Sequence, residues 1–203
     1  MRADAARNLE AVLTTGARML AADPGATIAS IAAEAGVDRR TVYRRFACRE
    51  DLLAAIHESR VTAIEEAIRH SRLREAPVAV ALHRYVESII AVNRTWPVDP
   101  ARMLDDDEIR RRRDACIAEV DHFLERATTE GLLRGNQPER WAGPLLPELM
   151  RLAAHQQAHL SPAQAADLVV DTFLYGFGVP THDRQKATEP GSRTPVSTGS
   201  LDT

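Results

Sequence analysis

Hydrophobic residues recur at the spacing of an α-helix along most of this chain. In residues 4–22 one face collects Leu9, Val12, Leu13, Gly16, Ala17 and Leu20. Asp23, Pro24 and Gly25 follow directly and predict a turn. The segment therefore predicts an amphipathic helix with one buried face.

Residues 27–46 carry the shorter pattern of two helices joined by a tight turn. Thr27 can cap the first helix, whose apolar face follows at helical spacing: Ile28, Ile31, Ala32 and Ala35. Gly36 predicts an abrupt end, because glycine readily adopts the positive φ that such an end requires. Asp38 can cap the second helix, whose buried side is marked by Val42 and Phe46.

The second of these helices has a basic outer face. Between residues 36 and 50, two acids (Asp38 and Glu50) stand against five arginines: Arg39, Arg40, Arg44, Arg45 and Arg49. Two helices joined by a glycine turn, the second short and basic, are typical of a helix-turn-helix that lays its second helix in the DNA major groove. The alternative is a three-helix core with a solvated arginine face. That alternative leaves the gathering of Tyr43 and the arginines on one side of a short helix unexplained.

Further helical patterns fill the rest of the chain and predict an all-α protein of about nine helices. A short piece is expected around Met103, and the longer helices are expected at residues 49–72, 77–96, 105–131, 138 or 141–160, and 161–177. The run of acids and arginines at 105–114 predicts i,i+4 ion pairs on a solvated face: Asp106 with Arg110, Asp107 with Arg111, and Glu108 with Arg112. Residues 180–203 have no period and are rich in Pro, Gly, Ser and Thr, so a disordered tail is expected there.

The charge distribution is uneven along the chain. Residues 1–72 hold 11 Lys and Arg against 10 Asp and Glu, a net charge of +1, whereas the remainder has a net charge of −4. DNA binding would thus depend on a local basic patch. Two cysteines form no disulfide framework, and neither a signal peptide nor a membrane span is evident, so a cytoplasmic protein is expected.

Residues 7–57 resemble the DNA-binding domain of the tetracycline-repressor (TetR) family. The matching residues are Ile31-Ala32, Ala35-Gly36-Val37, Thr41 to Phe46 and Arg49 to Leu53. Three positions depart from the family pattern. Arg40 stands where a small residue is usual, Arg49 replaces a lysine, and Cys48 replaces a capping serine or asparagine.

The resemblance implies a transcriptional regulator, most often a ligand-responsive repressor, that binds a palindromic double-stranded DNA operator as a homodimer. Contacts with DNA would fall to Thr27, Arg39, Arg40, Thr41, Tyr43, Arg44 and Arg49. The expected organisation is a DNA-binding domain at 1–50, a ligand-binding and dimerisation domain at 51–179, and the tail. Dimerisation is expected through the last two helices, with an apolar stripe of Leu145, Leu149, Leu152, Leu168, Val169, Thr172 and Phe173.

The unknown small-molecule effector would occupy the C-terminal helices. Candidate lining residues are Trp96, Met103, Phe123 and Trp141, although each can equally be ordinary core. The rival interpretation is a helical small-molecule-binding or interaction protein that no longer reads DNA.

Other candidate chemistry in the chain is weak. No nucleophile motif or phosphate loop is present, so an enzyme is not expected and no cofactor is assigned. His155 and His159 have the spacing of two metal ligands on one helix, but no third ligand is evident and no metal is expected. Cys48 at a helix start has the setting of a thiol with a lowered pKa, and an indifferent replacement of a capping residue is the competing interpretation.

Overall fold

The computed structural model describes residues 2–98, 106–135 and 141–176. Within these ranges the chain forms eight helices and no strand, which confirms the predicted all-α class. The helices are α1 (Arg2–Ala22), α2 (Ile28–Glu34), α3 (Arg39–Arg45), α4 (Arg49–Ser71), α5 (Val78–Thr95), α6 (Asp107–Thr129), α7 (Ala142–Gln156) and α8 (Pro162–Tyr175). The predicted short piece around Met103 and the predicted tail lie outside the described residues.

The predicted local signals of the two short helices are all present. Thr27 caps α2 by accepting a hydrogen bond from the Ser30 amide, and Asp38 caps α3 by accepting one from the Thr41 amide. Gly36 between them has a φ of 67°, the positive value expected from its place in the turn. The helix-turn-helix geometry therefore follows from residues within the segment itself.

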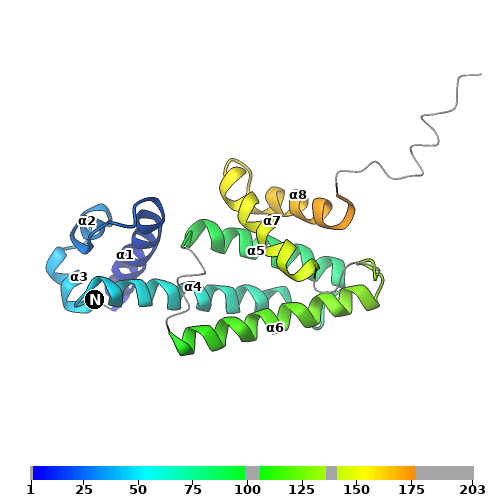
Figure 1. Cartoon of the computed structure of the whole chain (residues 1–203). Coiled ribbons are helices and arrows are strands. Elements are labelled where there is room, and N and C mark those ends of the chain that lie inside the picture. The colour runs from blue at the N-terminus through cyan, green and yellow to red at the C-terminus, as the bar shows by residue number, and fades with distance from the viewer. Residues whose placement is uncertain (1, 99–105, 136–140, 177–203) are drawn as a thin grey trace, which may run out of the picture.

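The long helix α4 runs from the N-terminal helices to the C-terminal ones (Figure 1), and its side chains enter two hydrophobic cores. The N-terminal core consists of Val12, Leu13, Ala17, Leu20, Ala26, Ile28, Ile31, Ala32, Val42, Phe46, Leu52, Ile56, Trp96 and Val98. The C-terminal core is built from the second half of α4 and from α5 to α8, with Leu82, Val86, Ile90, Leu146 and Met150 among its most buried side chains. The N-terminal core thus includes side chains of α4 and of the segment ending α5, and the division at residue 50 stays a prediction.

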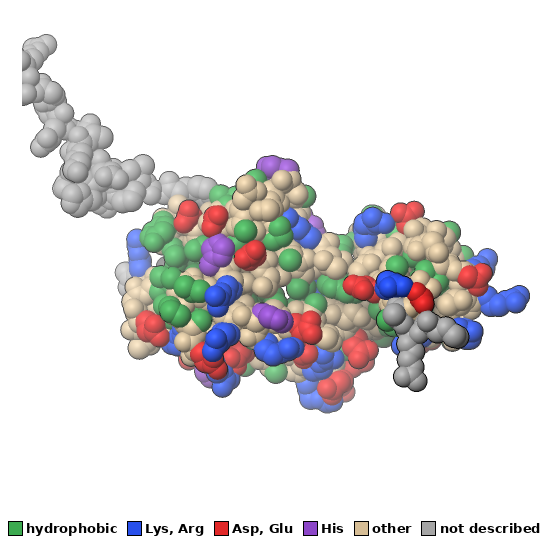
Figure 2. Space-filling view, turned by 180° about the vertical axis from the view of Figure 1, so that it is seen from behind, with side chains coloured by type: hydrophobic (Ala, Val, Ile, Leu, Met, Phe, Trp, Pro, Cys, Tyr) green, Lys and Arg blue, Asp and Glu red, His purple; other side chains and the backbone are tan. Residues whose placement is uncertain are grey.

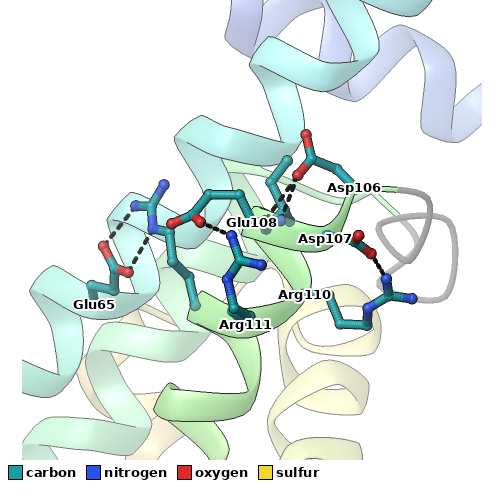
Figure 3. Close-up of polar contacts among 8 residues, drawn as sticks. Glu65, Asp106, Asp107, Glu108, Arg110 and Arg111 are labelled. Atoms are coloured by element: carbon teal, nitrogen blue, oxygen red, sulfur yellow. Dashed lines mark hydrogen bonds and ion pairs between the residues drawn. The ribbon is translucent and has the colours of Figure 1, made fainter.

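The arginine-rich start of α6 is paired differently from the sequence prediction (Figure 3). Asp106 is the N-cap of α6, and its carboxylate accepts the amides of Glu108 and Ile109 instead of pairing with Arg110. The ion pairs within the helix join residues three apart, Asp107 with Arg110 and Glu108 with Arg111. The predicted i,i+4 partners are wrong. The carboxylate of Asp106 is used as the N-cap, and Arg112 pairs with Glu65 on α4.

The neighbouring helix supplies the partner of Arg112. Its guanidinium donates to both carboxylate oxygens of Glu65 on α4, at 2.8 and 2.7 Å, and to the Thr62 hydroxyl at 2.9 Å. Further along α6, Glu119 forms a bidentate pair with Arg74, which lies just after the end of α4. These two pairs and the packing of Val61 on Ile109 hold α6 along α4.

The Glu65 contact makes a pH-dependent contribution to stability. Hydrogen bonds from Arg112 lower the pKa of Glu65 below its ordinary 4.5. A depressed carboxyl pKa adds stability above the unfolded-state value, and this stability is lost as pH falls through the folded value. We expect Glu65→Gln to lower the free energy of unfolding at neutral pH by less than about 1 kcal/mol, since the pair is partly exposed, and hardly at all below about pH 3. Glu66→Gln, which removes a carboxylate 3.8 Å from Arg69 on the same helix, is the control. Equal losses at both pH values would contradict the assignment.

Candidate nucleic-acid interface

The outward face of α3 presents the side chains that the sequence predicted as DNA contacts. Arg39, Arg40, Thr41 and Arg44 are exposed, whereas Val42 and Phe46 on the opposite face are buried in the N-terminal core. A short helix with one face held by the core and the other free can enter a DNA groove without losing its packing. Figure 2 shows Lys and Arg side chains, in blue, at the outer edge of the N-terminal part.

Tyr43 has a defined orientation on this face. Its side chain is 40% exposed, and the Arg39 guanidinium lies over its ring, 5.1 Å from the centroid. A cation over an aromatic face is attracted by the ring quadrupole. Arg39, which suits a base contact, and Tyr43, which suits a phosphate contact, are thereby held together one helical turn apart.

Arg49 and Thr27 lie at the starts of α4 and α2, which a hydrogen bond joins. Arg49 is the first residue of α4, and its Nη2 donates to the Pro24 carbonyl at 2.5 Å. Pro24 lies in the turn that leads to Thr27, so this bond connects the start of α4 to the start of α2. Within the described part of the chain, the Pro24 carbonyl is the acceptor of the Arg49 side chain, so its other guanidinium hydrogens can donate to an anion. The structure therefore places all seven predicted DNA-contact residues on the helix-turn-helix and the adjoining start of α4.

Arg45 differs from the other arginines of α3. It lines an open cleft of about 420 Å³ between α3, α4 and the start of α6, together with Phe46, Glu58, Asp106 and Arg112. The sequence pattern grouped all five arginines by their positive charge. The predicted DNA contacts included Arg44 but not Arg45, and the structure adds that Arg45 lies beside the start of α6.

The predicted ligand-lining residues are not brought together. Trp96 is part of the N-terminal core, whereas Phe123 belongs to the C-terminal core. Trp141 is 55% exposed at the start of α7, and Met103 lies outside the described residues. A shared lining of a single cavity by these four side chains thus has no support in the part that is described.

The structure does not bring His155 and His159 together as the two metal ligands that their spacing suggested. α7 ends at Gln156, so His159 lies beyond the helix and the two histidines do not share a helical face. In the described ranges no group of three or more metal-ligating side chains gathers.

Cys48 does not have the lowered pKa that its place at a helix start suggested. The Asp51 amide lowers the thiol pKa, but desolvation and the carboxylates of Glu50 and Asp51 outweigh it, so the pKa is raised. Cys116 is half-buried, and burial raises its pKa to about 11. Both thiols are thus poor nucleophiles at neutral pH.

Comparison with known proteins places this geometry in a family. Residues 13–56 match the profile described as bacterial regulatory proteins, tetR family. Over 155 residues the chain is 34% identical to the HTH-type transcriptional repressor LfrR of Mycolicibacterium smegmatis, covering 71% of this chain and 76% of that protein. The chain belongs to the TetR family. It is thus a DNA-binding transcriptional regulator by family membership, and the relatives compared are regulators, not enzymes.

Solved structures extend the agreement to most of the chain. The TetR-like regulator LfrR from Mycobacterium smegmatis in complex with proflavine has a TM-score of 0.68 at 27% identity, covering 86% of this chain and 98% of that chain. PfmR from Thermus thermophilus, at 17% identity and a TM-score of 0.65, covers 83% and 99% and shares the fold. Across the described residues, no helix is long and apolar enough to cross a membrane.

Two variants test the expected phosphate contacts. We expect Tyr43→Phe and Arg49→Ala to weaken binding to all DNA sequences alike, because phosphates carry no base identity. Loss of Arg49 should also reduce the slope of log affinity against log salt by about one unit per subunit. Affinities measured on specific and random duplexes over a salt series check both variants. A loss confined to the specific duplex would assign these residues to base reading instead.

Proposed function

We propose that this TetR-family regulator is a cytoplasmic, ligand-responsive repressor that binds a palindromic operator as a homodimer. The observation that carries the proposal is the exposed face of α3, where Arg39, Arg40 and Arg44 project from a helix anchored by Val42 and Phe46. Bidentate arginine contacts to guanine O6 and N7 are the commonest specific contacts in the major groove. We therefore expect G·C pairs within each half-site.

The dimer is proposed to form through α7 and α8. Leu152 is 54% exposed and Leu168 is 44% exposed, each on one of these helices. Apolar side chains left open on two adjacent helices are suited to an isologous contact, because a two-fold axis brings the same patch from both subunits together. Val169, by contrast, is 3% exposed within the C-terminal core and is unsuitable as an interface residue.

The effector is proposed to be a planar aromatic molecule held among the C-terminal helices. Support comes from the similar LfrR structure, which is a complex with proflavine, a planar aromatic cation. Of the four lining candidates, Phe123 lies in the C-terminal core and stays part of the proposal, since an aromatic ring can stack on a planar ligand. Ligand binding would favour a subunit arrangement unsuited to the operator and so shift the population away from the DNA-bound form.

Fluorescence titration with proflavine tests the effector class. The operator-bound wild-type protein should release DNA as proflavine is added, and Phe123→Leu should require a higher concentration for the same release. Trp141→Leu, which changes an exposed side chain at the start of α7, serves as the comparison. Binding of proflavine without any effect on operator affinity would remove this class from the proposal.

A further inference from the structure

Helix α5 and the residues that follow it contribute buried side chains to both hydrophobic cores. Most of the helix packs in the C-terminal core through Leu82, Val86 and Ile90, but Trp96 at its C-cap and Val98 just beyond are buried in the N-terminal core. The N-terminal core also holds Val42 and Phe46, which anchor the recognition helix. The placement of the DNA-reading part thus depends on where α5 ends.

A buried arginine fixes this end of α5 against α4. Arg60 is only 7% exposed, and its guanidinium donates to the Trp96 carbonyl at 2.5 Å and to Asn93 Oδ1 at 3.0 Å. Burial lowers the pKa of Arg60, and its Nε has no hydrogen-bond partner. Across the described ranges no carboxylate forms an ion pair with it. The acceptors that the described residues offer to this buried cation are neutral, and such an arrangement is costly to fold around, so stability alone gives little reason for an arginine here.

Arg94, the residue after Asn93, connects the last turn of α5 to the helices of the proposed dimer interface. Arg94 donates to the Leu160 carbonyl at 2.8 Å and to the Gln157 carbonyl at 3.0 Å, both in the connection between α7 and α8. Asn93 and Arg94 therefore tie one helical turn to α4 on one side and to the α7–α8 connection on the other. Trp96 extends this turn into the N-terminal core.

We propose that Arg60 is a positioning residue for operator reading. By holding the last turn of α5 on α4, it fixes the DNA-reading part relative to the α7–α8 pair and so sets the spacing of the two recognition helices in the dimer. Arg60 itself lies in the interior and does not touch DNA. The inference rests on the proposed dimer on a palindrome.

Operators with altered half-site spacing test this role. One added base pair rotates and displaces a half-site, so wild-type protein should lose about 30-fold in affinity on that operator. Arg60→Met keeps the length of the apolar stem but removes the donors, and should reduce this spacing penalty to about 3-fold while leaving affinity for an isolated half-site within about 2-fold. Arg60→Lys, which can still donate to one acceptor, should restore part of the penalty.

Arg126→Met is the matched control. Like Arg60, Arg126 donates to two neutral acceptors, here the main-chain carbonyls of Leu73 and Ala76, and it also pairs with Glu130, but it lies in the C-terminal half of α6. This variant should keep the wild-type spacing penalty whatever its effect on stability. If Arg60→Met does not fold, Asn93→Ala removes one acceptor alone and should give an intermediate penalty.

The outcomes separate the inference from the proposed function. A folded, dimeric Arg60→Met, or Asn93→Ala in its place, with the full wild-type penalty overturns the positioning role. Wild-type protein that binds one half-site as well as two overturns the palindromic dimer itself.

Discussion

Replacing Arg44 with Ala is expected to reduce affinity for the operator by about 1–3 kcal/mol per half-site and to relax the base preference at one symmetric position. Arg44 is exposed on the outward face of α3, on a helix that Val42 and Phe46 anchor in the N-terminal core. Truncation removes a bidentate donor without disturbing this anchor. Because the operator has two half-sites, the total loss should reach about 2–6 kcal/mol.

Arg45→Ala provides the matched control for this prediction. It removes the same charge from the adjacent position, but Arg45 lines the cleft beside α6. We expect a smaller loss that is similar on all sequences, because only the long-range attraction to phosphate changes. Binding across a panel of operators with single base changes distinguishes the two variants. An equal loss on specific and random DNA for Arg44→Ala would show that this residue does not read bases.

The second large effect is expected at the α7–α8 surface. The double substitution Leu152→Glu and Leu168→Glu places like charges on both subunits where exposed leucines are proposed to meet. Dimerisation should then be lost at micromolar concentration, and operator affinity should fall by at least about 100-fold, because each half-site must be bound independently. Sedimentation velocity and operator titration measure the two effects.

Ile117→Glu is the control for the dimer prediction. Ile117 is 49% exposed on α6, so this variant introduces a charge at a similarly open apolar position away from α7 and α8. It should remain a dimer with normal operator affinity. A double variant that stays dimeric, or a wild-type protein that is monomeric at micromolar concentration, would place the interface elsewhere or remove it.

The features predicted correctly from the sequence are those decided by neighbouring residues. The caps at Thr27 and Asp38 and the positive φ of Gly36 depend on groups within three or four positions. The exposed face of α3 follows in the same way from the spacing of Val42 and Phe46. The candidate DNA surface was therefore accessible without a structure.

Features that depend on distant segments were not accessible. Trp96 looked like a C-terminal side chain, yet it lies in the N-terminal core, 40 positions beyond Ile56 in the same cluster. Arg112 was assigned to a neighbour on its own helix, although Glu65 on α4 offers it both carboxylate oxygens. Helical periodicity identifies a buried face but does not identify the element that covers it. The ligand lining was therefore the weakest prediction, because it required knowing which helices cover each buried face.

Selection from a random duplex pool with the full chain, followed by a salt titration on the enriched sequence, tests the central claim most directly. We expect an enriched palindrome with half-site centres about 34 Å apart, two chains per duplex, and an affinity at least about 1000-fold above that for random DNA at physiological salt. Affinity on both duplexes should fall steeply with salt, because phosphate contacts release counterions. Absence of any enriched sequence, with equal binding to all duplexes, would contradict the assignment of this chain as an operator-reading regulator.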